Sequence, residues 1–183
     1  MSYINKVNGE RVYLSLSDKK DLDLYNKWLN DPDLNLSFGK SHDAYSIERQ
    51  EKYIDDYNNS DDKFFFVIIS KEENKPIGIC LLYDICYVHG KGTMGILIEA
   101  ESQNNGFAKE VSQLLLEFAF NILNLNNIML YAIDFNEKAI ELYKSIGFKV
   151  IGKRRQSYPI NNQVYDEVYL DILKEEFNNL DKI

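Results

Sequence analysis

The sequence predicts a mixed α/β fold in which helices flank a central, partly antiparallel sheet. Short apolar runs typical of buried strands alternate with amphipathic stretches typical of helices, in the order β-α-α-β-β-β-α-β-α-β-β. Short polar turns join the middle strands as hairpins, whereas helices separate the later strands and must cross over the sheet. No linker or internal repeat interrupts this order, so residues 1–183 are expected to form a single domain.

The composition limits the classes of function. A chain of 183 residues that is 45% hydrophobic is large enough for one core. It has no run of 18 apolar residues and no apolar N-terminal leader, so we expect a cytoplasmic protein without membrane contact. A net charge of −8 argues against nucleic acid as a partner. With only two histidines, no metal site is expected.

The first half of the chain is expected to contribute most of the hairpin-connected strands. Apolar runs bounded by turn residues predict strands over 12–16, 64–70, 77–88 and 93–99. Two helices are expected, one from a cap at Ser17 or Asp18 to Leu29 and one over about 46–57. Asp31-Pro32 ends the first helix, and residues 33–44 are expected to be irregular. Cys80 and Cys86 would lie about 20 Å apart on one strand, beyond disulfide reach.

The second half is expected to hold the crossover helices. An apolar stripe predicts a long helix after Gly106, and it consists of Phe107, Val111, Leu114, Leu115, Phe118 and Ile122. A strand follows over 127–133 and a short helix over 136–145. The last two strands are predicted over 148–152 and 164–173.

Residues 103–110 form a glycine-centred turn between the strand 93–99 and the long helix. This layout leaves backbone N–H groups unpaired at the positive end of a helix dipole, which is a phosphate-binding arrangement. Neither a Gly-x-Gly-x-x-Gly fingerprint nor a P-loop ending is present, and the pattern is Gln103-x-x-Gly106-x-Ala108. The alternative interpretation is an ordinary loop-to-helix turn that uses glycine for backbone freedom.

A second motif covers residues 136–148. Asn136 suits the N-cap of a short helix, Gly147 the position just after its end, and Phe148 the start of the next strand. One face of this helix carries Ala139, Ile140, Tyr143 and Ile146.

The two motifs, in this order and about thirty residues apart, resemble those of the GNAT superfamily of N-acetyltransferases. Gly152 to Arg155 and Tyr165-Asp166 look like its ribosomal-protein and polyamine acetyltransferase branch. The resemblance covers roughly residues 10–173, is specific from about residue 92 and implies a GNAT-like fold. It implies acetyl-CoA as co-substrate, with the pantetheine arm between splayed strands 93–99 and 127–133. The implied cofactor-binding residues are Ile96, Leu97, Ile98, Gln103, Asn104, Asn105, Gly106, Phe107, Ala108, Asn136 and Tyr143.

Acetyl transfer also needs an acid and a route for the proton of the amine. Tyr143 is the expected acid, because a phenol of pKa about 10 stays protonated at neutral pH and can donate to a departing thiolate. The alternative is a core tyrosine. Asp84 ranks above Glu99 as the base, although each also fits a solvated strand-end acid, and an amine that arrives neutral needs no base. Some relatives carry a glutamate where this chain has Tyr131. Lys109 either adds charge near the cofactor or is an ordinary solvated lysine.

The acceptor is expected to be a primary amine, polyamine-like or another small amine. Residues 118–143 look most like the spermidine branch, yet the loop 38–43 offers a lysine and one acid where that branch has paired acids. Alternatives are a peptide N-terminus, a non-catalytic acyl-CoA-binding module and a structural interaction domain. His42 either touches a substrate or is an exposed loop residue. Pairing of C-terminal edge strands between chains predicts a homo-oligomer.

Overall fold

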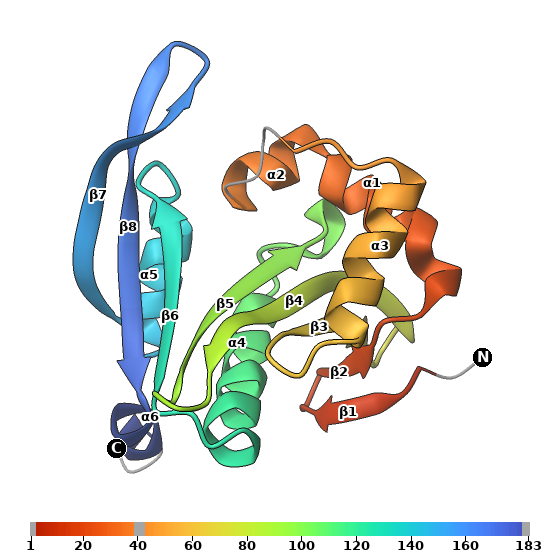
Figure 1. The fold of residues 1–183 in the computed structure, drawn as a ribbon, viewed down its shortest axis with the longest axis horizontal. Coiled ribbons are helices and arrows are strands. Elements are labelled where there is room, and N and C mark those ends of the chain that lie inside the picture. Colours follow the sequence, from red (N-terminus) through yellow and green to blue (C-terminus); the bar gives the residue numbers. More distant parts are fainter. Residues whose placement is uncertain (1–2, 39–42, 181–183) are drawn as a thin grey trace.

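A mixed sheet runs through the whole molecule (Figure 1). The computed structural model describes residues 3–38 and 43–180, and among these residues eight strands pair in the order β1-β2-β3-β4-β5-β6-β8-β7. Of the strand pairs in this described part of the chain, only β5–β6 is parallel, which confirms the predicted partly antiparallel sheet. The strands are β1 (Asn5–Asn8), β2 (Val12–Leu16), β3 (Phe64–Ser70), β4 (Lys75–Cys86), β5 (Lys91–Ile98), β6 (Asn127–Ile133), β7 (Lys149–Ile160) and β8 (Gln163–Leu173).

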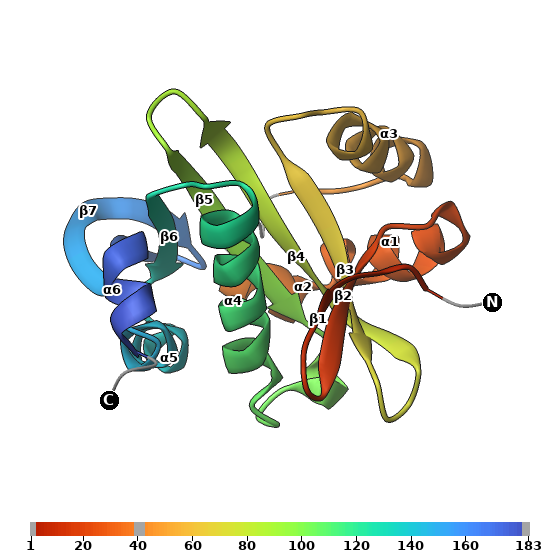
Figure 2. The same cartoon turned by 90° about the horizontal axis from the view of Figure 1, so that it is seen from below.

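Helices cover both faces of the sheet (Figures 1 and 2). They are α1 (Leu22–Asn30), α2 (Pro32–Phe38), α3 (Ile47–Asn58), α4 (Phe107–Glu117), α5 (Glu137–Ser145) and α6 (Lys174–Leu180). Short 3-10 turns form at Lys19–Asp21 and Ala100–Ser102, and a π-helical turn, Phe118–Ile122, extends α4. The helices α1 and α3 pack on one face, and α4, α5 and α6 pack on the other.

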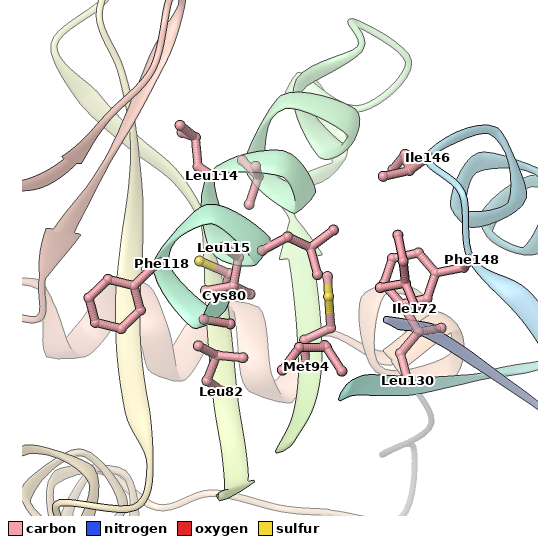
Figure 3. Close-up of a cluster of buried hydrophobic side chains, with 14 of the residues drawn as sticks. Cys80, Leu82, Met94, Leu114, Leu115, Phe118, Leu130, Ile146, Phe148 and Ile172 are labelled. Carbon is pink, nitrogen blue, oxygen red and sulfur yellow. The ribbon is translucent and has the colours of Figure 1, made fainter. Parts of the chain in front are cut away.

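Successive side chains along a strand point to opposite faces of the sheet, so each face contributes to a separate hydrophobic core. In β3, Phe66 and Ile68 face α4, whereas their neighbours Phe65, Val67 and Ile69 face α1 and α3. The apolar stripe predicted after Gly106 is confirmed as far as Phe118, because Leu114, Leu115 and Phe118 are buried in this core (Figure 3). Its last predicted member, Ile122, is instead 69% exposed at the end of the π-helical turn. Cys80 belongs to the same core and is fully buried, as expected of a small apolar residue.

The prediction of irregular structure over 33–44 is wrong at its start, where α2 forms. Asp31 Oδ1 accepts hydrogen bonds from the backbone N–H groups of Asp33 and Leu34, each at 3.0 Å. Asp31 therefore caps α2, and Pro32 occupies the first helical position, where its missing N–H costs nothing. Asp31-Pro32 ends one helix and begins another. Residues 39–42, which include His42, lie outside the described part of the chain.

Three further elements differ from the sequence prediction. The short strand β1 and helix α6 were not predicted, and β7 continues to Ile160 instead of ending at Gly152. Residues 149–156 of β7 are all exposed, so the strand lacks the apolar alternation that would reveal it. β7 is an edge of the sheet, and the homo-oligomer stays a prediction. No helix among the described residues is long and apolar enough to cross a membrane.

Candidate active site

The strands β5 and β6 separate along their length, which opens the sheet at its centre. They pair only where Lys91–Thr93 meet Asn127–Met129. Beyond that point they diverge (Figure 1), and the edge of β5 from Met94 to Ile98 is paired on one side only, with β4. Backbone groups on the open side of β5 therefore remain available to a ligand. This divergence is the splay that the family resemblance implied.

The turn before α4 has the geometry expected of an anion site. Gln103 donates from Nε2 to the Ile98 carbonyl at 2.9 Å, which ties the turn to the end of β5. Asn104 and Gly106 both have positive φ, 61° and 79°. Gly106 is the N-cap of α4, and no described side chain caps this helix end. The first N–H groups of α4 therefore keep their donor capacity at the positive end of the helix.

Glycine at position 106 is required for its backbone conformation. A Cβ atom there would find no protein atom nearer than Arg11 Nη1, at 3.7 Å. Space in the protein itself is thus available, but a φ of 79° strains any residue with a Cβ atom. The predicted closeness of ligand phosphates adds a second reason, since a side chain at 106 would stand between them and the N–H groups.

A cavity of about 640 Å³ connects this turn with the open edge of β5. It is lined by all the predicted cofactor residues except Asn105. The Asn105 carbonyl accepts a hydrogen bond from Arg11 Nη2 at 2.8 Å, and the Asn105 side chain donates to the Ser102 carbonyl at 3.4 Å. Lys109 and Lys138 also line the cavity, and they give it positive charge near the helix N-termini.

Tyr143 reaches the cavity from α5, which is capped by a side chain at its N-terminal end and by backbone hydrogen bonds at its C-terminal end. Asn136 Oδ1 accepts from the Ala139 N–H at 3.2 Å, which confirms the predicted N-cap. At the other end, Gly147 has φ 103° and Phe148 donates to the Tyr143 carbonyl at 3.0 Å, the pattern of a Schellman motif. The Tyr143 ring packs edge-on against Phe148, with centroids 5.6 Å apart. Burial raises the pKa of Tyr143 to about 12.

Four tyrosines form the other part of the cavity wall, and only Tyr131 among them was named from the sequence, as the residue in place of a glutamate. They are Tyr53, Tyr57, Tyr83 and Tyr131. Burial raises the pKa of each phenol, so all four stay neutral near pH 7. The sequence signal was present in the chain's 13 tyrosines, but only the fold brings α3, β4 and β6 to one cavity.

The carboxylates considered as bases lie outside the cavity lining. Asp84 is exposed in an irregular part of β4 with φ 52°, and it is close enough to Tyr57 and Tyr83 to help raise their pKa. Glu99 accepts from Ser102 Oγ at 2.9 Å and braces the turn before Gln103. Among the described residues that line the cavity, none is an aspartate or glutamate. The described residues also contain no cluster of three metal-ligating side chains.

Comparisons of the sequence and of the structure with known proteins agree on one family. Residues 14–169 match the family model described as an acetyltransferase (GNAT) domain. The spermidine N(1)-acetyltransferase of Vibrio cholerae is 28% identical over 98% of this chain and 90% of its own, and that of Escherichia coli K12 is 27% identical over 76% and 73%. The crystal structure of the Vibrio cholerae spermidine N-acetyltransferase with CoA and spermine superimposes with a TM-score of 0.86. It is 26% identical, and the match covers 92% of this chain and 99% of that chain.

Proposed function

The chain belongs to the GNAT acetyltransferase family, and on this premise we propose that it transfers the acetyl group of acetyl-CoA to an alkyl amine of the polyamine type. The observation that carries the proposal is that the turn before α4, the open edge of β5, Tyr143 and four further tyrosines all line one and the same cavity. It combines a phosphate-binding end with an apolar, aromatic chamber. Residues 1–183 are proposed to form one such domain.

The donor end fits the chemistry of acetyl-CoA. The phosphates of acetyl-CoA could accept hydrogen bonds from the uncapped N-terminus of α4 and pair with the cationic side chains of Lys109 and Lys138. Its pantetheine amides match the unpaired backbone edge of β5 around Ile96 to Ile98. Asn136, which lines the cavity while capping α5, is proposed to bind the cofactor as well as the helix end.

In the proposed reaction the amine nitrogen attacks the acetyl carbonyl carbon, the carbon–sulfur bond breaks, and the thiolate leaves as CoA. The amine gives up one proton and the sulfur gains one, so the protons balance. Tyr143 is proposed to donate a hydrogen bond to the departing sulfur, since its raised pKa keeps the phenol protonated. The described lining holds no carboxylate, and the amine proton is proposed to leave by way of water or before binding.

The acceptor chamber favours an aliphatic chain that carries positive charge. Tyrosine faces attract ammonium groups and also pack against methylene chains. Asp84 lies near Tyr57 and Tyr83 without lining the cavity, so its placement fits attraction of a cation at the edge of the chamber better than proton abstraction inside it. The acceptor named for the Vibrio cholerae relative, spermidine, has this chemistry.

The test is release of free thiol from acetyl-CoA against a panel of amines. We expect turnover with spermidine and spermine, and little with an amino sugar, an aminoglycoside or peptides with Ala, Ser or Met N-termini. Turnover only with the peptides would replace the polyamine by a protein N-terminus. Binding of CoA without turnover on any amine would replace the enzyme by an acyl-CoA-binding module, and absence of CoA binding would refute the donor site itself.

A further inference from the structure

We propose that Arg11, in the turn between β1 and β2, is a positioning residue that fixes the orientation of the phosphate-binding turn. The inference rests on the proposed function, since it concerns how that turn receives acetyl-CoA. Figure 2 shows the β1–β2 turn beside the N-terminal end of α4. Arg11 is separated from Asn105 by 94 positions in the sequence, so no local motif contains the pair.

The guanidinium of Arg11 contacts the turn on both sides of Gly106, at Asn105 and at Phe107. Nη2 donates to the Asn105 carbonyl at 2.8 Å, and the guanidinium carbon lies 4.3 Å from the centroid of the Phe107 ring. Between these two contacts, Nη1 lies 3.7 Å from the point where a Cβ atom of Gly106 would be. The side chain thus spans three successive residues of the turn.

The backbone of Arg11 is fixed independently of its side chain. Glu110 Oε1, on the first turn of α4, accepts from the N–H groups of Arg11 at 2.8 Å and Val12 at 3.2 Å. On the other side, the Lys71 N–H donates to the Arg11 carbonyl at 2.9 Å. A Cβ atom at Gly9 would lie 2.6 Å from Glu110 Oε1, so the close approach of this turn to α4 requires glycine there. The guanidinium is therefore presented from a rigid base.

The bond to Asn105 determines which way the next N–H points. In a planar trans peptide the carbonyl of residue 105 and the N–H of residue 106 point in opposite directions. Gly106 lines the cavity, whereas Arg11 and Asn105 do not. The bond from Arg11 is therefore inferred to hold the Asn105 carbonyl on the side of the turn that faces away from the cavity. The Gly106 N–H is thereby directed to the cavity side. If this peptide turned over, a carbonyl oxygen would face the phosphates instead of a donor.

The test compares Arg11→Met with the unmodified enzyme in binding CoA by calorimetry. Methionine keeps an unbranched chain over the Phe107 ring and leaves the backbone bonds to Glu110 in place, but it has no donor. We expect the Kd for CoA to rise about tenfold, the loss of one charge-assisted hydrogen bond. The KM for acetyl-CoA should rise in parallel, while kcat at saturation and the KM for S-acetylpantetheine, which lacks the phosphates, should stay unchanged.

Arg49 supplies a matched control. Its guanidinium carbon lies 4.4 Å from the Tyr45 ring centroid and its Nη1 donates to the Ala44 carbonyl at 2.6 Å, a similar construction outside the cavity lining. Arg49→Met should leave the CoA affinity unchanged. Equal CoA affinity of Arg11→Met and the unmodified enzyme would overturn the inference, as would equal losses with acetyl-CoA and S-acetylpantetheine. Failure of the unmodified enzyme to bind CoA would instead refute the proposed function.

Discussion

Replacing Tyr143 by phenylalanine removes one oxygen atom from a residue that lines the cavity. The ring remains, so its packing against Phe148 at 5.6 Å and the helix end beneath it should be kept. We therefore expect unchanged stability and an unchanged Kd for CoA. The change isolates what the phenol does for the reacting atoms, since Tyr143 lines the same cavity as the α4 turn.

The size of the effect follows from the raised pKa. A phenol of pKa about 12 is a much weaker acid than a thiol of pKa about 8.5. Full proton transfer to the leaving sulfur is thus unfavourable, and the phenol acts mainly as a hydrogen-bond donor to the developing negative charge. Removing one such donor from a buried site typically lowers kcat by about 10² to 10³.

The assay is thiol release at saturating acetyl-CoA and amine, measured beside calorimetric CoA binding. Tyr87→Phe is the control, because it deletes the same atom from an exposed tyrosine outside the cavity lining. In the unmodified enzyme, ionisation of Tyr143 should not reduce kcat below about pH 11, since the phenol titrates near its raised pKa. A kcat for Tyr143→Phe within about threefold of the unmodified enzyme would refute the role of the phenol.

Three other substitutions test the remaining parts of the site. Gly106→Ala should destabilise the turn by about 1 kcal/mol in denaturation and weaken CoA binding in calorimetry, because φ at this position is 79°. Gly152→Ala is the control and should change neither property, because its Cβ atom would have no atom within 4 Å and its φ is not positive. Asn136→Ala should lower the free energy of unfolding by about 1 kcal/mol through loss of the cap, and Asn136→Asp should retain it; equal stability of all three proteins would exclude the cap. Asp84→Asn should raise the KM for spermidine up to about fivefold at low salt and leave kcat unchanged, because an exposed carboxylate attracts the cation only weakly. A large fall in kcat, with loss of the acid limb of the pH–rate profile, would instead make Asp84 the base.

The sequence predicts best what depends on neighbours along the chain. The bounds of β2, β3 and β6 are correct, as are the N-cap at Asn136 and the Gly147 helix end, because each follows from a local pattern of apolar, capping or turn residues. The start of β7 was predicted but its continuation from Gly152 to Ile160 was not, because residues 149–156 are exposed and the strand is ordered by pairing with β8. The helix α2 was missed because Asp31-Pro32 satisfies the rules for ending a helix and for starting one.

The two ends of the cavity also differ in how far they depend on neighbours along the chain. The donor end is encoded mostly within residues 96–108 and 136–143, since a phosphate turn needs a strand, a glycine and a helix N-terminus in succession. The contacts that complete it, Arg11 on Asn105 and Glu110 on Arg11, span more than 90 positions and carry no local signal. The acceptor end joins side chains from separate elements, because Tyr53 and Tyr57 come from α3, Tyr83 from β4 and Tyr131 from β6. If these tyrosines bind the acceptor as proposed, substitutions at them should change the preferred amine without disturbing the donor motif. A motif of that kind therefore identifies the reaction more readily than the substrate.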